Sequence, residues 1–397
     1  MTTNSLVLQC GGPTAVVNSS LAGVIAARQR TGAFGTLWGC RLGLQGLVHG
    51  DWVELTDLSS VQLDRLRMQP GAALGSGRYR MQASELPALL QRLQEHGVGA
   101  LFIIGGNGSM AAGHAIGQAA AAAGYIVDGQ PLAVVGIPKT IDNDLVGTYV
   151  APGYGSAARF IAQTVRDIGL DLRAMRNYDD VVVLEVMGRH TGWLAAAGAL
   201  ARQVADDPPH LILLPEAPLD EGAFLARVHQ VHAAQDVCLV VASEGARAAG
   251  GAFLAEAGGP ALADASGQKM LSLAAGVAPY LAGLIRRELG LLCRQLRPDT
   301  IQRASSGLAS AVDRDLAELV GTAAVEHAQG GAQDVMIGVD RQGDGWQAVA
   351  VPLADVLGRE RVVPQSYIDE TRFDVTPAFV EYARSVVGEL SLARILL

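Results

Sequence analysis

The sequence predicts an α/β protein built from two three-layer domains, each with a parallel-type sheet. Short uncharged runs that suit buried strands, such as Leu132–Ile137, alternate along the chain with longer helical segments, and this strand–helix–strand order is typical of parallel sheets. A chain of 397 residues is too long for one ordinary core and fits two domains. The 48 glycines suit many tight turns between strand and helix.

The first series of alternating elements runs to about residue 153. Its strands are short apolar runs, predicted at Leu6–Cys10, Thr36–Trp38, Ala100–Ile104 and Leu132–Ile137. Its helices are longer segments, predicted at Val16–Arg30, Ser84–His96 and Ser109–Ala123. We expect Ser84 to cap its helix and Pro87 to lie in the first turn, where the missing N–H costs nothing.

A second series begins near Tyr154. Its predicted helices are 154–173, 191–203 and 271–289, and its predicted strands are Val181–Val186, Leu211–Leu214 and Val237–Val241. A further helix is predicted at 311–329, and further strands at 334–338 and 346–351. We therefore expect one domain to comprise 1–153 plus about 302–345. The other would comprise about 154–301 plus 346–397, with an insertion around 246–290.

Composition limits the classes of function. The formal net charge is −9 and the isoelectric point is near 5.4, which argues against nonspecific binding to nucleic acid or to an anionic membrane. The four cysteines are scattered, so neither a disulfide framework nor a zinc site is indicated. The first residues show no signal-peptide pattern, and we expect a cytoplasmic protein.

The segment Pro138–Asp144 follows the apolar run Leu132–Ile137. Open α/β sheets bind ligands where strands end, so two carboxylates, a lysine and a hydroxyl are predicted to converge at a site. One carboxylate, Asp142 or Asp144, can orient a substrate hydroxyl while the other organises a magnesium–phosphate group, which suits phosphoryl transfer. The alternative is a turn in which these side chains only cap the strand end.

Two glycine-rich loops follow predicted strands. Gly11-Gly12-Pro13 and Gly105–Ser109 could each bind phosphate oxygens through backbone N–H groups and a helix N-terminus. Neither is a Walker loop, and neither has the spacing of the dinucleotide-binding fingerprint. For each loop taken alone, a simple tight turn is the favoured interpretation.

Several arginines follow strands in the second half of the chain. Arg189 ends the Val181–Val186 strand, where a guanidinium could lie beside a transferring phosphoryl group. Arg294, Arg297 and Arg303 form a cationic series that suits a sugar phosphate. The alternative for each is an ordinary solvated charge. The eight histidines show no metal-ligand spacing.

Taken together, these motifs resemble the phosphofructokinase superfamily, and more closely its pyrophosphate-dependent branch. The resemblance covers nearly the whole chain, with the motifs in the family's order. The matching segments are Gly11–Asn18, Gly75–Arg78, Gly105–Ser109, Pro138–Asp144, Val186–Arg189, Leu214–Glu216 and Ile301–Arg303.

This resemblance implies two Rossmann-like domains in the phosphofructokinase fold, with the active site in the cleft between them. It implies Asp142 as the base for the sugar 1-hydroxyl, with Thr140 and Arg189 as its catalytic companions. The residues that it implies for the donor are Gly11, Gly12, Arg78, Gly106, Gly108, Ser109 and Lys139. The residues that it implies for the sugar phosphate are Thr140, Asp142, Met187, Gly188, Arg189, Glu216, Arg294 and Arg303.

The resemblance further implies Mg²⁺ as cofactor, near Asn107 and Asp144, and a homodimer or homotetramer, because some family members take sugar-phosphate arginines from a neighbouring subunit. The implied reaction is the reversible, glycolytic transfer of a phosphoryl group from pyrophosphate to fructose 6-phosphate. The chain departs from the family pattern at three positions. Asn107 replaces a usual aspartate, Thr300 replaces a histidine of the ATP-dependent enzymes, and Asp180 replaces a frequent arginine.

The donor loop carries mixed signals. Gly108 resembles the residue of ATP-dependent relatives, whereas Lys139 and the Gly11–Thr14 variant resemble the pyrophosphate-dependent branch. We predict pyrophosphate as donor, because the Lys139 side chain would fill space that a nucleoside needs. The alternatives are an ATP-dependent 6-phosphofructokinase, a weakly catalytic sugar-phosphate-binding regulatory paralogue, and an enzyme similar to NAD kinases.

Overall fold

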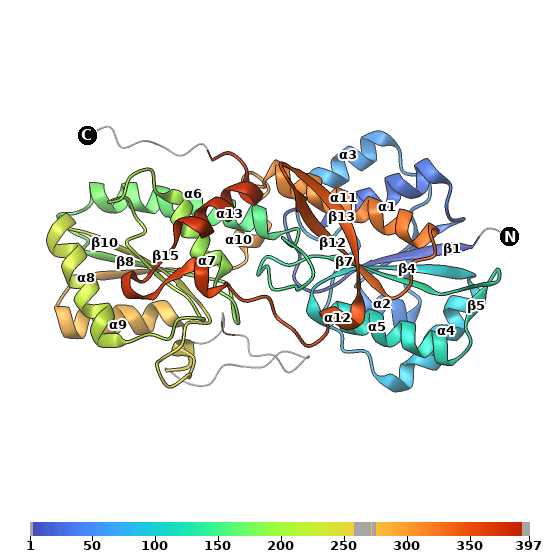
Figure 1. The fold of residues 1–397 in the computed structure, drawn as a ribbon, viewed down its shortest axis with the longest axis horizontal. Helices are drawn as coiled ribbons and strands as arrows, with labels where there is room; N and C mark the ends of the chain where they lie inside the picture. Colours follow the sequence, from blue (N-terminus) through green and yellow to red (C-terminus); the bar gives the residue numbers. More distant parts are fainter. Residues whose placement is uncertain (1–2, 258–270, 272–274, 391–397) are drawn as a thin grey trace. The chain divides into compact units, whose positions relative to one another are not determined.

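A computed structural model describes residues 3–257, 271 and 275–390 (Figure 1). The chain forms two compact units. The first comprises Met1–Tyr154 and Ala311–Glu360, and the second comprises Gly155–Ser310 and Arg361–Leu397. Each unit has its own sheet and its own buried apolar cluster.

The first unit contains a seven-stranded sheet in the order β13-β12-β7-β4-β1-β2-β3. Its five central strands are parallel, and the edge strands β3 and β13 are antiparallel to their neighbours. The strands are β1 (Asn4–Gln9), β2 (Leu37–Cys40), β3 (Trp52–Glu54), β4 (Val98–Gly105), β7 (Ala133–Pro138), β12 (Val335–Gln342) and β13 (Gly345–Pro352). A separate short hairpin is formed by β5 (Ile126–Val127) and β6 (Gln130–Pro131).

Helices cover both faces of this sheet, as Figure 1 shows. Helix α1 packs against α11 and α3 on one face, while α5 packs against α4 and α12 on the other. The helices are α1 (Val17–Thr31), α2 (Leu44–His49), α3 (Ser60–Met68), α4 (Leu86–Glu95), α5 (Asn107–Ala122), α11 (Ala311–Gln329) and α12 (Leu353–Val356). The three-layer arrangement predicted for this domain is therefore present.

The second unit contains a four-stranded, wholly parallel sheet in the order β11-β8-β10-β9. The strands are β8 (Val181–Val186), β9 (Leu211–Leu213), β10 (Cys238–Ser243) and β11 (Cys293–Leu296), with a small hairpin of β14 (Ile368–Asp369) and β15 (Asp374–Val375) beside β9. The helices are α6 (Tyr154–Ala174), α7 (Trp193–Ala197), α8 (Glu221–Gln235), α9 (Val277–Leu289), α10 (Ile301–Ala304) and α13 (Pro377–Val387).

The domain boundaries differ from the sequence prediction. Strand β13 pairs with β12 along its whole length, so 346–360 belongs to the first unit rather than the second. Residues 302–310 belong to the second unit, because the first unit resumes only at Ala311. Helix α9, inside the predicted insertion 246–290, packs on β8 and β11 and contributes buried residues such as Leu281 to the core. Part of that insertion, 258–270 and 272–274, lies outside the described residues.

The prediction of a cap at Ser84 is wrong. A short 3₁₀ turn, Ala83–Glu85, precedes α4, and its capping box joins Gln82 and Glu85 instead. Pro87 lies in the first turn of α4, as predicted. The predicted helix 191–203 is shorter and is completed by the 3₁₀ turn Gly198–Ala201.

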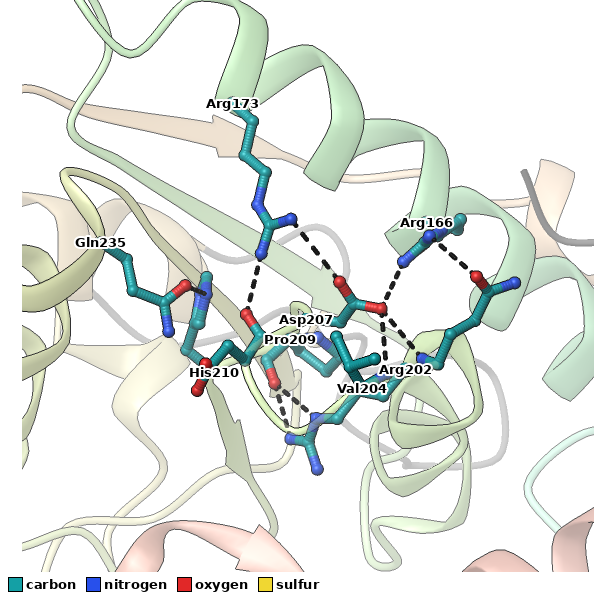
Figure 2. A network of polar contacts seen from close by, with 10 residues as sticks. Arg166, Arg173, Arg202, Val204, Asp207, Pro209, His210 and Gln235 are labelled. Carbon is teal, nitrogen blue, oxygen red and sulfur yellow. Dashed lines mark hydrogen bonds and ion pairs between the residues drawn. The ribbon is translucent and has the colours of Figure 1, made fainter. Parts of the chain in front are cut away.

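A buried network of hydrogen bonds and ion pairs connects α6 to the segment that leads into β9 (Figure 2). The Asp207 carboxylate accepts hydrogen bonds from Arg166 at 2.7 Å and from the backbone of Gln203 and Val204. Arg166 and Asp207 are 1% and 0% exposed, and Arg173 adds an ion pair to Asp207 at 3.6 Å. A buried carboxylate is tolerated when it is paired and hydrogen-bonded in this way. The network therefore fixes the start of β9.

Candidate functional site

The turn after β7 is held by an asparagine. Asn143 is fully buried, has a left-handed backbone with φ of 54°, and accepts a hydrogen bond from the Ala151 N–H at 3.0 Å. Asparagine tolerates this conformation better than most residues. Asp142 and Asp144, on either side of it, are partly exposed. The anchoring contact to Ala151 thus comes from Asn143, and the carboxylates of Asp142 and Asp144 do not make it.

Backbone contacts fix the rest of this turn. The Thr140 hydroxyl accepts a hydrogen bond from the Asp142 N–H at 3.0 Å, and the Thr140 N–H donates to Pro152. The next residue, Gly153, donates to the carboxylate of Asp313, which is 1% exposed on α11. Asp313 is a buried acidic residue that sequence reasoning missed. In a sequence, an aspartate in the first turn of a helix indicates only the common favourable interaction with the helix dipole.

Lys139 connects the turn to the first glycine loop. Its Nζ donates a hydrogen bond to the Gly12 carbonyl at 2.9 Å, and its side chain is 5% exposed. A Cβ at Gly11, where φ is 75°, would lie 3.1 Å from Nζ. Burial raises the pKa of Cys10 to about 11, and the positive charge of Lys139 opposes that shift. An ammonium group is therefore buried among the backbone groups of a candidate phosphate loop.

The glycine loops lie at the carboxyl ends of neighbouring strands. Gly11 follows β1, and its N–H donates to Gly77 at 3.2 Å, while the Ser76 hydroxyl donates to the Gly11 carbonyl at 2.5 Å. Arg78, exposed, comes next. These contacts bring the Gly11–Gly12 and Gly75–Arg78 segments together.

The second glycine loop begins a helix. Gly106 is the N-cap of α5, so Asn107, Gly108 and Ser109 form the first turn, where backbone N–H groups are available to an anion. Gly108 is exposed, and no described atom outside its chain neighbours and its own helix backbone lies within 4 Å of the position of a Cβ there. The Lys139 N–H donates to Gly105 at 2.9 Å, which joins this loop to the turn after β7. The predicted donor residues of the first unit therefore converge.

Asn107 and Asp144 form a pair that fits a magnesium ion together with phosphate oxygens. The Asn107 Nδ2 donates to Asp144 Oδ2 at 2.9 Å, and Oδ1 of each residue is buried without a hydrogen-bond partner. Mg²⁺ is commonly held by one or two carboxylates plus substrate phosphates. Among the described residues no group of three His, Cys, Asp or Glu side chains could hold a metal by itself. Any metal here would need oxygens from its substrate.

In the second unit, the loop after β8 carries Met187, Gly188 and Arg189. The Met187 N–H donates to Gln302 Oε1 at 3.0 Å, and Gln302 is 2% exposed on α10. Because Arg303 is the next residue of α10, this contact brings it to the same region as the loop. The sequence alone indicates no separate role for Gln302, because its contact with Met187 is a long-range hydrogen bond.

Glu216 lies beside the same loop. Its carboxylate accepts hydrogen bonds from the Gly192 N–H at 3.0 and 3.1 Å and from the Val363 N–H at 2.9 Å. Burial raises the pKa of Glu216, although these hydrogen bonds favour its charged form. Glu216 thus holds the start of α7, three residues after Arg189, in addition to any contact with a ligand.

Within the chain, Arg294 lies apart from the group formed by Met187–Arg189, Glu216 and Arg303. It lies on β11 opposite Val182, near the amino end of β8, whereas Met187–Arg189 follow the carboxyl end of that strand. Its guanidinium pairs with Asp179 at 2.7 Å and its side chain is 54% exposed. Asp180, at the same end, accepts hydrogen bonds from Leu292 and His232. Arg297 lies at the other end of β11 and pairs with Glu185 at 3.0 Å.

Comparisons with known proteins agree with this arrangement of motifs. The family model for phosphofructokinase matches residues 4–328. A pyrophosphate–fructose 6-phosphate 1-phosphotransferase of Xanthomonas campestris is 39% identical over 401 residues, which covers 98% of this chain and 93% of the relative. A sulfofructose kinase of Alkalicoccus urumqiensis is 36% identical over 92% of this chain and 91% of the relative.

The solved structures include a close neighbour. The crystal structure of a pyrophosphate-dependent phosphofructokinase from Nitrosospira multiformis superposes with a TM-score of 0.88 and 33% identity, over 99% of this chain and 94% of that chain. No helix in the described part of the chain is long and apolar enough to cross a membrane. With the family model, the near full-length relatives and the shared fold in agreement, this chain belongs to the phosphofructokinase family.

Proposed function

We propose that this chain catalyses reversible, magnesium-dependent phosphoryl transfer from pyrophosphate to the 1-hydroxyl of fructose 6-phosphate. The products are fructose 1,6-bisphosphate and phosphate. The proposal is supported by the relative named for this reaction at 39% identity and by a match to the family model over residues 4–328. Such transfer needs in-line positioning and neutralisation of charge more than covalent chemistry.

In the first unit, Asp142 acts as the base that takes the proton from the sugar hydroxyl. Thr140 lies beside it, since its hydroxyl accepts the Asp142 N–H. The donor is bound by the backbone N–H groups of the glycine loops, by Arg78 and by Lys139. The donor residues so proposed are Gly11, Gly12, Gly106, Gly108 and Ser109.

Asn107 and Asp144 would hold Mg²⁺ through the two Oδ1 atoms that are buried without partners. When bound, the ion supplies positive charge to the phosphate oxygens of pyrophosphate. An amide and one carboxylate give a weaker site than two carboxylates, so the substrate phosphates supply much of the coordination.

In the second unit, Met187, Gly188, Arg189 and Glu216 bind the sugar, and Arg303 binds its 6-phosphate. Arg294 faces away from this group along β11, which suits a contact with the sugar phosphate of a neighbouring subunit in a homodimer or homotetramer. We also propose a cytoplasmic location for this assembly.

The observation that carries the choice of donor is the contact of Lys139 Nζ with the Gly12 carbonyl. It places a cation within the loop that would hold the terminal phosphates of the donor, and it fills space next to Gly11. A donor-swap assay tests this choice. Purified protein is supplied with fructose 6-phosphate and either pyrophosphate or ATP, and formation of fructose 1,6-bisphosphate is measured.

Turnover with pyrophosphate and little with ATP is the expected result. A preference for ATP would establish the alternative ATP-dependent enzyme, and no turnover with either donor would favour the regulatory paralogue. Retention of Asp142 and Arg189 argues against that last reading.

Asp180 favours sulfofructose as a second candidate sugar. Asp180 stands where the family often has an arginine for the 6-phosphate, and the sulfofructose kinase relative shares 36% identity. A sulfonate carries less negative charge than a phosphate and needs fewer cations. The same assay with sulfofructose in place of fructose 6-phosphate separates the two sugars by their kcat/KM.

A further inference from the structure

Two buried side chains, which we call the amide pair, lie on either side of the Gly11–Gly12 loop. Gln9 ends β1 and Asn18 lies in the first turn of α1, and both residues are 0% exposed. The Gln9 Nε2 donates hydrogen bonds to Asn18 Oδ1 at 2.9 Å and to the Val17 carbonyl at 3.3 Å. The amide pair therefore joins the strand before the loop to the helix after it.

The amide pair also binds the backbone of the segment 69–74, which is distant in sequence. The Asn18 Nδ2 donates to two carbonyls of this segment, at 2.9 and 2.6 Å, and Asn18 Oδ1 accepts one of its N–H groups at 2.9 Å. The Gln9 Oε1 accepts a second N–H group at 3.1 Å. The residues held in this way are Gln69, Gly71, Ala73 and Leu74. Each nitrogen and oxygen of the two buried amides thus has a partner, as buried polar groups require.

The segment 69–74 leads directly into the Gly75–Arg78 loop. Residues 69–78, all of them described, lie outside the helices and strands. The segment also lines part of a cavity of about 630 Å³, so packing does not support it on every side. A segment with neither helix nor strand pairing, and with a cavity beside it, depends on individual hydrogen bonds for its position. Gln9 and Asn18 supply four of these bonds.

The loop 75–78 is held to Gly11 at its other end, through both the N–H and the carbonyl of that glycine. The amide pair flanks the Gly11 loop and also binds 69–74, so it fixes the two loops relative to each other. A displaced segment 69–74 would carry Arg78 away from the backbone of Gly11. The placement of an exposed arginine on one loop therefore depends on two fully buried amides.

We propose that the amide pair positions the Gly75–Arg78 loop for the phosphoryl donor, so that the Arg78 guanidinium meets phosphate oxygens held by the Gly11–Gly12 backbone. Gln9 and Asn18 are positioning residues, because both are fully buried and act through the loop. This inference rests on the proposed function, in which Arg78 binds pyrophosphate. A cation that is held in place before its ligand arrives binds it without the cost of ordering a loop.

Gln9→Met tests the inference, because methionine keeps most of the volume and removes every hydrogen bond of the Gln9 amide. We expect the KM of pyrophosphate to rise about 3- to 30-fold and the KM of fructose 6-phosphate to stay within about twofold of wild type, because the displaced groups face the donor. Calorimetric titration with pyrophosphate measures the same loss without turnover. In an Arg78→Ala background, Gln9→Met should have little further effect on either measurement, because the group that it positions is gone.

Tyr125→Phe is the matched control in the same unit. The buried Tyr125 hydroxyl donates to the Val98 carbonyl at 2.6 Å, at the amino end of β4, whereas the glycine loops follow the carboxyl ends of their strands. Like Gln9→Met, this variant loses a buried hydrogen bond and should have a lower melting temperature. Both KM values should stay near wild type, because the donor loops are not displaced.

A second variant, Asn18→Asp, replaces Gln9→Met if that protein does not fold. It keeps the shape and the acceptor oxygen but loses the donor to the carbonyls of 69–74, so the same rise in the KM of pyrophosphate is expected. An unchanged KM of pyrophosphate in the folded variant, an equal rise in both KM values, or losses from Gln9→Met and Arg78→Ala that multiply would overturn the inference. A wild-type protein that neither binds nor uses pyrophosphate would instead refute the proposed function, and this inference with it.

Discussion

The side-chain amide of Asn107 donates a hydrogen bond to the carboxylate of Asp144 across 2.9 Å, and each residue keeps one buried oxygen without a hydrogen-bond partner. A buried oxygen without a donor is costly, so this pair is suited to a cation that supplies the missing interaction. The two residues come from different strands, since Asn107 begins α5 after β4 and Asp144 follows β7. Their meeting depends on the parallel pairing of β4 with β7.

Asn107→Asp should lower the magnesium concentration needed for half-maximal activity, by roughly an order of magnitude, because a second carboxylate binds a hard cation better than an amide does. Without metal, the two like charges should lower the melting temperature. A magnesium titration of activity and of thermal stability measures both effects. An unchanged or weaker magnesium requirement would remove Asn107 from the metal site.

Asp142→Asn should lower kcat about 10²–10⁴-fold with a small change in the KM of fructose 6-phosphate, because the change removes the base and keeps the shape. The Asp142 N–H to Thr140 contact involves the backbone and should survive the substitution. Steady-state kinetics at saturating pyrophosphate measure the effect. A loss below tenfold would show that Asp142 is not the base.

Arg303→Ala should raise the KM of fructose 6-phosphate with a lesser effect on kcat, since it removes a charge-assisted contact present in both the ground and the transition state. Arg303 follows Gln302, whose side chain accepts the Met187 N–H, so we expect Arg303 to act within its own chain. Arg294→Ala should raise the same KM through the neighbouring subunit. An unchanged KM in either variant would exclude that arginine from the sugar-phosphate site.

The sequence predicted the first half of the site better than the second. Lys139, Asp142 and Asp144 were identifiable because they directly follow a buried strand. The carboxyl ends of parallel strands lie at the same edge of a sheet, where ligands bind. Asp313 and Gln302 were not identifiable, because each contacts a partner that is distant in sequence. The edge strand β13 was assigned to the wrong domain for the same reason, since only its pairing with β12 shows where it belongs.

Asp207→Asn should lower the free energy of unfolding by about 3–5 kcal/mol, because it leaves the buried Arg166 without its charged partner. Burial by itself would raise the pKa of Asp207, but the hydrogen bonds from Gln203, Arg166 and Val204 outweigh it and the pKa is lowered. The carboxylate therefore stabilises the fold above the pKa of the unfolded chain, about 3.9, and this contribution is lost as the pH falls through the lower folded value.

Urea unfolding of wild type and Asp207→Asn at several pH values measures that contribution. The difference between the two proteins should be constant near neutral pH and should shrink only below about pH 4. A difference that already disappears near pH 6 would mean that the ion pair with Arg166 does not supply the stability.

Lys139→Gly tests the donor directly. The Nζ of Lys139 lies against the Gly12 carbonyl and beside Gly11. The side chain therefore occupies space in the loop and also places a positive charge there. Gly108 already leaves open space on the neighbouring loop. If Lys139 excludes the nucleoside part of ATP, its removal should reduce the use of pyrophosphate and produce measurable turnover with ATP.

Lys139→Met is the matched control, because it keeps most of the volume and removes the charge. Exclusion by volume predicts that the methionine variant still rejects ATP while the glycine variant accepts it. The measurement is kcat/KM for both donors in wild type and both variants. If both variants lose pyrophosphate use and neither gains ATP, Lys139 is a phosphate ligand and the excluded volume does not select the donor. Its buried ammonium beside Gly11 and Gly12 would then act through its charge.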